Sequence, residues 1–312
     1  MVRKGLIWYL PFRVVQGILF LGWFGLLMAC QPSLPPPLSE TPPTAIPTLT
    51  DTQPSPLPTP SPAPHISTPI RAPTLCPEGK VELYTLDSTP IGKPLRFRIY
   101  FPPCYNPQAE SKYPVLYLLH GQGSDETLWM DLGLPQLADR LMSEGQIPPF
   151  LIVMPYEEYA LRDPRESVFG QTIVENLIPW VESHFAVCPA RGCRALGGIS
   201  RGGGWALHLF IQYPNLFIAV GVHSPAPFWG DDLRLYYRTA ENPPEQWPNL
   251  YLDSGERDRY LKPAQAFVNR LGELGIPHEW HLNSGEHNSA YWQNHLEDYL
   301  RWYAAQWRIP AP

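Results

Sequence analysis

A serine between glycines lies where a predicted strand meets a predicted helix. Residues 198–202 have the sequence GISRG; the apolar run 195–199 leads into Ser200, and a helix-compatible stretch, residues 205–210, follows it. The pattern Gly-x-Ser-x-Gly is typical of a tight strand-to-helix turn that presents a serine hydroxyl, with glycines where a Cβ would clash. Ser200 is therefore a candidate nucleophile.

A serine hydroxyl becomes a useful nucleophile when a base takes its proton and an acid orients the base. His287 lies in a glycine-containing loop, residues 284–288, between the last predicted strand and the last predicted helix. A loop at a strand end suits a base that must reach the serine, so His287 is the candidate base. Other downstream histidines fall within or beside predicted helices and strands, where we expect structural roles: His208, His278, His281 and His295.

The candidate acid follows a predicted strand at residues 250–252. With a serine turn of this kind, the order along the chain is serine, acid, histidine. Asp258 lies in the loop proper and can reach across to a histidine, whereas Asp253 lies at the strand end. We therefore assign Asp258, with Asp253 as the alternative and Glu256 as a third choice.

Two backbone N–H groups are needed to stabilise the negative charge that develops on an attacked carbonyl oxygen. Arg201, the residue after the nucleophile, provides one of them. The other is expected from the loop after the third predicted strand, residues 119–124 (LHGQGS). We assign it to the N–H of Gln122, because the glycines on either side let a carbonyl approach. His120 is expected to brace this loop.

The elements that position these residues alternate along the chain, as in an α/β fold with a mostly parallel central sheet flanked by helices. Apolar runs predict strands at residues 81–86, 95–101, 115–119, 151–154, 194–199, 218–222, 250–252 and 279–282, the first two as an antiparallel pair. Helical periodicity appears at residues 134–142, 173–184, 205–212, 263–274 and 289–307. No insertion is long enough for a large lid domain, so we expect an open cleft.

Aromatic side chains are predicted in or near loops at the carboxyl ends of the strands. They are Trp129, Tyr156, Phe228, Trp229 and Trp292. Aromatic rings in such loops suit the binding of sugar or phenolic rings, and packing beneath the loops is the alternative. We expect these residues to line the rim of a substrate pocket.

The N-terminal segment is typical of a targeting sequence. Arg3, Lys4 and Arg13 precede an uncharged apolar run, residues 14–29, that is short for a membrane-spanning helix and suits a signal peptide. The run ends in Leu-Met-Ala-Cys, which resembles a bacterial lipobox, so we expect lipidation of Cys30; an uncleaved membrane anchor is the alternative. Either interpretation predicts an extracytoplasmic, membrane-anchored protein.

Composition divides the remainder into a tether and one folded domain. Residues 31–75 are rich in Pro, Ser and Thr, which favours extended polyproline II and no core. The predicted organisation is a signal peptide at 1–29, a lipidated cysteine and disordered tether at 30–75, and a catalytic domain at 76–312. A length of this order supports a sizeable core that needs no metal to fold.

The net charge and the cysteines indicate which nucleic-acid, metal and disulfide interactions to expect. The formal net charge of −6 argues against a nucleic-acid partner, which requires a basic face. Beyond Cys30, the chain has Cys76, Cys104, Cys188 and Cys193, for which we expect the disulfides Cys76–Cys104 and Cys188–Cys193. A zinc site is disfavoured because no Cys-x-x-Cys pair is present. We expect no metal and no cofactor.

Together these motifs resemble the putative-esterase family of α/β-hydrolases. That group includes feruloyl and acetylxylan esterases, S-formylglutathione hydrolases, enterochelin-type esterases and antigen 85 mycolyltransferases. The similar blocks are residues 113–121, 177–185, 197–203 and 285–287 followed by Tyr291 and Trp292. The resemblance implies the α/β-hydrolase fold and places nucleophile, acid and base on Ser200, Asp258 and His287.

Arg201 departs from many relatives, which carry Met or another apolar residue at this position. Its side chain is expected either to reach an acidic group of a substrate or to pair with an acid such as Glu157. The resemblance leaves three functions open. The first is a serine esterase that hydrolyses small-molecule or polysaccharide-linked esters through an acyl-enzyme. The others are an acyltransferase of the mycolyltransferase type and a tethered binding module on an inactive hydrolase fold.

Overall fold

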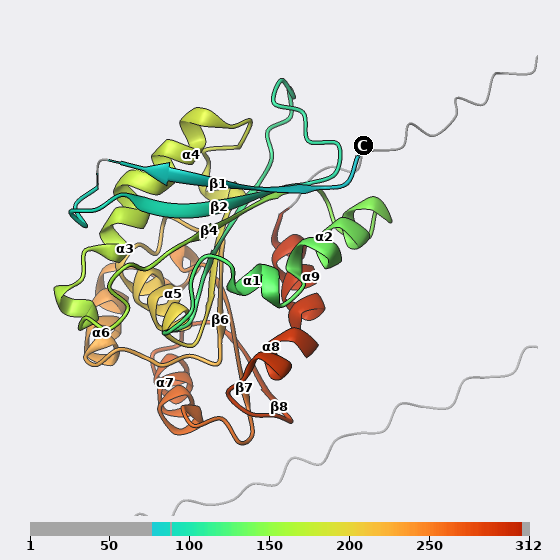
Figure 1. Cartoon of the computed structure of the whole chain (residues 1–312). Helices are drawn as coiled ribbons and strands as arrows, with labels where there is room; N and C mark the ends of the chain where they lie inside the picture. Colours follow the sequence, from blue (N-terminus) through green and yellow to red (C-terminus); the bar gives the residue numbers. More distant parts are fainter. Residues whose placement is uncertain (1–76, 88, 308–312) are drawn as a thin grey trace, which may run out of the picture. The chain divides into compact units, whose positions relative to one another are not determined.

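The computed structural model describes residues 77–307 except residue 88. An eight-stranded sheet with the order β1-β2-β4-β3-β5-β6-β7-β8 forms its centre (Figure 1). β1 (Lys80–Leu86) pairs antiparallel with β2 (Leu95–Phe101), and β2 pairs antiparallel with β4 (Leu151–Pro155). Every pairing from β4 onward is parallel. The prediction of a mostly parallel sheet opened by an antiparallel pair is therefore confirmed.

The remaining strands and the helices follow the predicted alternation. The strands are β3 (Val115–Leu119), β5 (Arg194–Ile199), β6 (Ala219–His223), β7 (Asn249–Gly255) and β8 (Glu279–Asn283). The α-helices are α1 (Leu128–Asp131), α2 (Leu134–Ser143), α3 (Phe169–Thr172), α4 (Ile178–His184), α5 (Arg201–Gln212), α6 (Asp231–Glu241), α7 (Leu261–Glu273), α8 (Ser289–Asn294) and α9 (Leu296–Gln306). Short 3-10 turns occur at Pro164–Glu166, Arg191–Cys193 and Pro244–Gln246.

Two hydrophobic cores cover the two faces of the sheet. In β3, Val115, Tyr117 and Leu119 belong to one core, and Leu116 and Leu118 belong to the other. This division follows from the strand, whose successive side chains point to opposite faces. Helices α3 to α7 pack on the first face, and α1, α2, α8 and α9 pack on the second (Figure 1). A strand buried on both faces is apolar throughout, as the sequence of β3 is.

Two predicted helices differ from the observed ones. The helix predicted at residues 173–184 is π-helical at Ile173–Leu177 before α4 begins, and Pro179, near the start of α4, has no N–H to donate. The helix predicted at residues 289–307 is two helices, because His295, with φ −103° and ψ 2°, separates α8 from α9. The helix α6 has no counterpart in the prediction.

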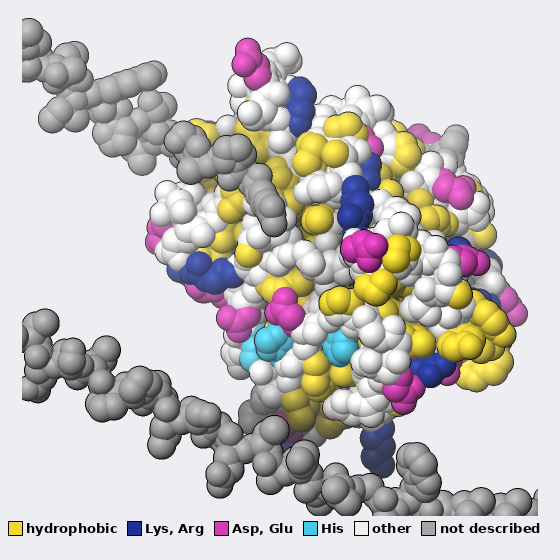
Figure 2. All heavy atoms as spheres, turned by 180° about the vertical axis from the view of Figure 1, so that it is seen from behind, with side chains coloured by type: hydrophobic (Ala, Val, Ile, Leu, Met, Phe, Trp, Pro, Cys, Tyr) yellow, Lys and Arg dark blue, Asp and Glu magenta, His cyan; other side chains and the backbone are white. Residues whose placement is uncertain are grey.

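The surface of this part of the chain is mixed in charge. On the face shown in Figure 2, Lys and Arg side chains are scattered among acidic and hydrophobic ones and form no continuous basic area. Among residues 77–307, no helix has both the length and the apolar character needed to cross a bilayer. The predicted signal peptide, tether and lipidated Cys30 lie outside the described residues.

Candidate active site

Ser200 occupies the turn between β5 and α5 in a strained backbone conformation. Its φ of 57° and ψ of −114° are uncommon for a residue with a Cβ. Backbone hydrogen bonds hold it there: its N–H donates to the carbonyl of His223 at 2.9 Å, and its carbonyl accepts from the N–H groups of Gly204 and Ala226 at 2.9 and 3.1 Å. The turn thus fixes the direction of the serine side chain from both sides.

One imidazole joins the serine to a carboxylate. His287, in the loop between β8 and α8, has its Nε2 2.8 Å from the Oγ of Ser200 and its Nδ1 2.9 and 3.0 Å from the two carboxylate oxygens of Asp258. The His287 and Asp258 side chains are buried. The His287 ring also lies edge-on between Tyr260 and Trp292, with ring centroids 4.9 and 5.2 Å away. These contacts leave the imidazole little freedom to turn.

The carboxylate of Asp258 is held in its ionised form. Burial raises its pKa, but hydrogen bonds from His287 and, at 2.7 Å, from the backbone N–H of Tyr260 outweigh this effect. The net result is a pKa below the ordinary value for an aspartate. An ionised Asp258 accepts a hydrogen bond from the Nδ1–H of His287, which leaves the Nε2 unprotonated and able to accept the proton of the serine hydroxyl.

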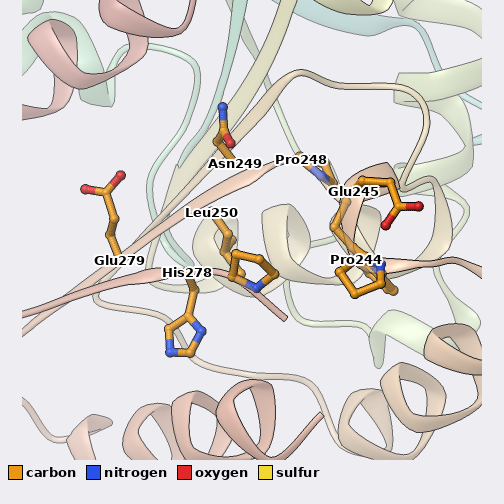
Figure 3. Close-up of a pocket in the computed structure, with 9 residues that line it drawn as sticks. Pro244, Glu245, Pro248, Asn249, Leu250, His278 and Glu279 are labelled. Atoms are coloured by element: carbon orange, nitrogen blue, oxygen red, sulfur yellow. The ribbon is translucent and has the colours of Figure 1, made fainter. Parts of the chain in front are cut away.

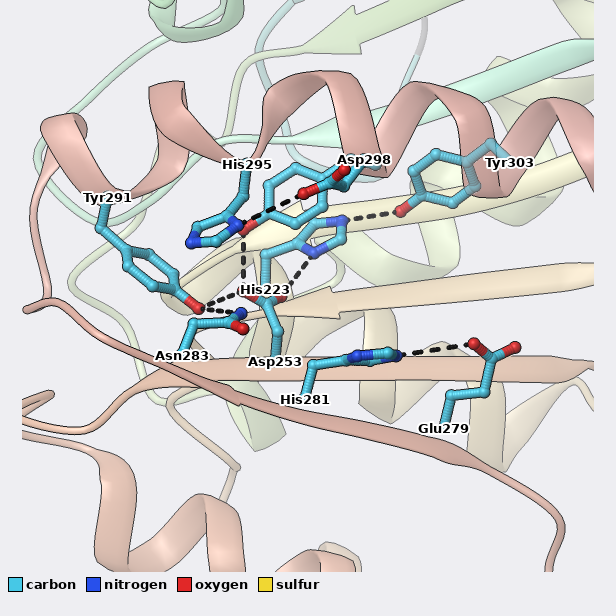
Figure 4. A network of polar contacts seen from close by, with 10 residues as sticks. His223, Asp253, Glu279, His281, Asn283, Tyr291, His295, Asp298 and Tyr303 are labelled. Carbon is cyan, nitrogen blue, oxygen red and sulfur yellow. Dashed lines mark hydrogen bonds and ion pairs between the residues drawn. The ribbon is translucent and has the colours of Figure 1, made fainter.

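Asp253, the alternative acid, lies in a separate buried network (Figure 4). Its Oδ1 contacts the Nδ1 of His223 at 2.8 Å, and its Oδ2 accepts from the hydroxyls of Tyr291 and Tyr299 at 2.7 and 2.8 Å. The Nε2 of His223 in turn lies 3.0 Å from the hydroxyl of Tyr303. These contacts satisfy Asp253 without His287. Glu256, the third choice, accepts a hydrogen bond from Ser284 at 3.3 Å, whereas His287 contacts Asp258.

The loop proposed to carry the second N–H donor lies directly against Ser200. A Cβ built on Gly121 would lie 3.4 Å from the Cβ of Ser200, and one built on Gly202 would lie 2.6 Å from the carbonyl oxygen of His120. The glycines therefore permit the loop after β3 and the first turn of α5 to approach each other closely. The backbone N–H groups of Gln122 and Arg201 belong to these two segments.

His120 braces this loop, as expected. Its Nε2 accepts the N–H of Glu157 at 2.8 Å, so its Nδ1 carries the proton and donates to the carbonyl of Gly121 at 2.8 Å. Burial lowers the pKa of His120, which favours this neutral form. The ring of Tyr156 stacks on His120 with centroids 5.6 Å apart, and the guanidinium of Arg96 lies over Tyr156.

The side chain of Arg201 forms a buried ion pair. Its Nε and Nη2 donate to the two carboxylate oxygens of Glu157 at 2.8 and 2.6 Å, and Nη2 also donates to the carbonyl of Arg162 at 2.9 Å. Arg201 and Glu157 are 8% and 3% exposed. Of the two expectations for Arg201, pairing with Glu157 is the one that the structure contains.

The predicted rim residues separate into different environments. Trp229 is 80% exposed and Phe228 is half-buried; both line a pocket of about 380 Å³ between the loop after β6 and α7. Tyr156 is half-buried on His120. Trp292, 8% exposed, packs on His287. The prediction for Trp129 is wrong: it is 1% exposed, because α1 turns it into the core beside His223.

A second pocket lies at the amino-terminal ends of the strands, opposite the ends that carry Ser200, Asp258 and His287. It has a volume of about 370 Å³ and is lined by residues around the amino ends of β7 and β8, including Asn249, Leu250, His278 and Glu279 (Figure 3). Ser200, Asp258 and His287 follow the carboxyl ends of β5, β7 and β8. In parallel sheets, ligands bind at the carboxyl ends of the strands. This favours the ends that carry Ser200 as the place of the active site.

Of the two predicted disulfides, Cys188–Cys193 is present and closes the short loop before β5. Cys76, the predicted partner of Cys104, lies outside the described residues.

Sequence reasoning did not identify Tyr260 as a contact of His287 or Ser224 as a strained residue. Ser224 has a φ of 46°, and its N–H donates to the carbonyl of Asp253 at 2.9 Å. The available signal for Ser224 was its position directly after β6, at the same edge as Ser200.

Comparisons with known proteins identify the family of this chain. A family model described as putative esterase matches residues 88–303. The chain is 28% identical over 230 residues to an endo-1,4-beta-xylanase/feruloyl esterase of Xylanibacter ruminicola, with coverage of 70% of this chain and 30% of that protein. It is 27% identical over 259 residues to an esterase of Mycobacterium tuberculosis, with coverage of 65% and 55%. The chain thus spans about half or less of the length of these relatives.

Solved structures share the fold. A ferulic acid esterase matches with a TM-score of 0.65 and 23% identity, over 73% of this chain and 99% of that one. An S-formylglutathione hydrolase from Staphylococcus aureus matches with a TM-score of 0.63 and 18% identity, over 73% and 100%. The sheet order, the flanking helices and the serine turn define an α/β-hydrolase fold, and the described part of the chain, residues 77–307 without residue 88, contains no large lid. Within that class, the chain belongs to the putative esterase family.

Proposed function

We propose that this protein is a carboxylic-ester hydrolase in which Ser200 is the nucleophile, His287 the general base and acid, and Asp258 the residue that orients His287. The observation that carries the proposal is the imidazole of His287, which contacts the Ser200 hydroxyl through one nitrogen and the Asp258 carboxylate through the other. Membership of the putative esterase family supports the same reaction class.

The reaction proceeds in two halves. The Oγ of Ser200 attacks the ester carbonyl carbon while the Nε2 of His287 takes the hydroxyl proton. The carbonyl oxygen becomes negatively charged and accepts hydrogen bonds from the N–H groups of Arg201 and Gln122. Collapse of this intermediate breaks the bond to the alcohol, which leaves with the proton from His287. Water then attacks the acyl carbonyl carbon while His287 takes one of its protons. When the second intermediate collapses, the bond to Ser200 Oγ breaks, Oγ takes that proton back from His287, and the carboxylic acid is released.

We propose carbohydrate-linked or phenolic esters as the substrate class. Phe228 and Trp229 provide aromatic surface in the pocket between the loop after β6 and α7. That loop starts close to Ser200, because the N–H of Ala226 donates to the Ser200 carbonyl. Sugar and phenolic rings pack well on such aromatic faces. A relative of this chain is named for feruloyl ester cleavage, which supports the choice.

We also propose an extracytoplasmic location in which a lipid on Cys30 anchors the protein to a membrane. This proposal rests on the sequence of residues 1–30.

The test is hydrolysis of p-nitrophenyl acetate by the wild-type protein and by Ser200→Ala, together with labelling by a fluorophosphonate. We expect the substitution to abolish both. Full activity in Ser200→Ala would refute the assignment, and a wild-type protein that neither turns over nor labels would instead favour a tethered binding module. Product analysis with added alcohols separates hydrolysis from acyl transfer. A panel of acetyl, feruloyl and longer-chain esters then identifies the preferred acyl group.

A further inference from the structure

Glu157 contacts two different segments of the candidate active site, one through its side chain and one through its backbone. It follows β4, is 3% exposed, and belongs to neither of the segments that carry the proposed N–H donors. Its carboxylate binds Arg201, and its N–H binds His120. A buried charge is costly unless it is paired, so a residue of this kind needs a structural or functional reason.

The first contact controls the start of α5. Two parallel hydrogen bonds join the guanidinium of Arg201 to the carboxylate, and a third joins it to the carbonyl of Arg162. A bidentate pair fixes orientation as well as distance, because the guanidinium and the carboxylate are both planar. The side chain that is fixed belongs to the same residue whose backbone N–H is one proposed donor.

The second contact controls the loop after β3. The N–H of Glu157 donates to the Nε2 of His120, and the Nδ1 of His120 donates to the carbonyl of Gly121. The peptide between Gly121 and Gln122 is trans and planar, so its C=O and N–H point in opposite directions. Fixing the carbonyl of Gly121 therefore fixes the direction of the Gln122 N–H, which is the other proposed donor.

We propose that Glu157 is a positioning residue that sets the geometry of both oxyanion donors at once. Its carboxylate acts through Arg201, and its N–H acts through His120 and Gly121. The inference rests on the proposed function, since the donors matter only if an oxyanion forms. The inference gives Arg201, which differs from the residue in many relatives, a structural role. Its side chain connects the turn that carries Ser200 to the segment after β4, and Glu157 neutralises its buried charge.

The experiment compares two conservative substitutions in buried Arg–Glu pairs. Glu157→Gln removes the charge but keeps the shape and the backbone N–H. The matched control is Glu182→Gln, because Glu182 pairs with Arg194 at 2.5 Å at the opposite end of β5, and both side chains are largely buried. We measure kcat and KM for p-nitrophenyl acetate, the affinity for a trifluoromethyl ketone, and the unfolding midpoint of each variant.

We expect Glu157→Gln to lower kcat by about 10-fold or more, a part of the 10²–10³-fold that loss of a whole donor costs, while KM changes by less than about threefold. The trifluoromethyl ketone forms a tetrahedral adduct with Ser200 that carries an oxyanion, so its affinity should fall in parallel with kcat. Glu182→Gln should lower the unfolding midpoint and leave kcat and the ketone affinity unchanged.

A double variant separates positioning from stability. Glu157→Gln with Arg201→Met removes both charges, which often restores stability relative to a single unpaired charge. We expect its unfolding midpoint to exceed that of Arg201→Met alone while its kcat stays low. Recovery of kcat together with stability, or an unchanged kcat and ketone affinity in Glu157→Gln, would overturn the inference. Failure of the proposed function is distinguishable, because Ser200→Ala would then equal the wild type.

Discussion

The backbone N–H of Ser200 donates to the carbonyl of His223 at 2.9 Å, so the serine turn rests on the end of β6. The side chain of His223 is fully buried beneath that turn and belongs to the network of Asp253, Tyr291, Tyr299 and Tyr303. Three donors converge on Asp253: the Nδ1 of His223 and the hydroxyls of two tyrosines. Full satisfaction of this kind stabilises a buried carboxylate, whereas partial satisfaction is costly.

Asp253→Asn should therefore destabilise the protein more than it affects chemistry. The amide cannot accept every hydrogen bond that the carboxylate accepts, so donors remain unpaired in the core. We expect a loss of about 2–4 kcal/mol in the free energy of unfolding, measured by urea denaturation. Tyr299→Phe, which removes one of the donors, should cost about 1–2 kcal/mol. A change below about 0.5 kcal/mol in Asp253→Asn would contradict the role of this network.

Asp258→Asn should have the opposite profile. The side chain keeps its size, but its NH₂ group no longer requires the Nδ1–H form of His287, so the Nε2 loses its role as acceptor. We expect kcat for p-nitrophenyl acetate to fall by about 10³–10⁴-fold, with circular dichroism at neutral pH unchanged. If Asp253→Asn instead produced this loss and Asp258→Asn did not, the assignment of the acid would be wrong.

The same carboxylate predicts a pH dependence of stability. The pKa of Asp258 is lower in the folded protein than in the unfolded chain, since the hydrogen bonds from His287 and Tyr260 outweigh burial. Its stabilising effect is therefore complete above the ordinary aspartate pKa of about 4 and is lost as the pH falls through the folded value. The difference in free energy of unfolding between wild type and Asp258→Asn should shrink over that acidic interval. A difference that is constant with pH would exclude this linkage.

Trp229→Ala tests the aromatic pocket. Trp229 is highly exposed, so its removal should change the free energy of unfolding by no more than about 0.5 kcal/mol. Loss of an aromatic contact should raise KM for a feruloyl ester by about 2- to 10-fold, with less effect on p-nitrophenyl acetate. Tyr237→Ala is the matched control, because Tyr237 is also exposed, on α6, and is not among the residues that line this pocket. Equal effects of the two substitutions would argue against the pocket.

Sequence patterns were sufficient for the central strands because these are buried on both faces and are therefore mostly apolar. β3 and β5 are buried along their whole length, so their composition alone identifies them. The helix α6 was not predicted, because most of its apolar residues do not coincide with its buried positions. Its exposed positions include Leu233, Tyr236 and Tyr237, while Asp231 and Leu235 are buried, and this mixture conceals the periodicity of a surface helix.

The candidate site was predictable where chain order and loop position constrain a residue, as at His287 and Asp258. It was not predictable where burial decides. Trp129 lies in the short helix α1. Whether its side chain is buried depends on how that helix packs, which no local sequence pattern gives. Pairing of Arg201 with Glu157 was one of two expectations from the sequence. The sequence could not choose between them, because the choice depends on how close the segment after β4 lies to the start of α5, and β3 lies between β4 and β5 in the sheet.

The tyrosines of α9 have a consequence for biosynthesis. Ser200, Asp258 and His287 have all been translated before Tyr299 and Tyr303, yet these two side chains complete the buried support beneath the serine turn. A nascent chain, or one cleaved by a protease before α9, would contain Ser200, Asp258 and His287 and still lack these two tyrosines. A chain that ends before α9 should therefore lack the hydrogen bonds of Tyr299 to Asp253 and of Tyr303 to His223.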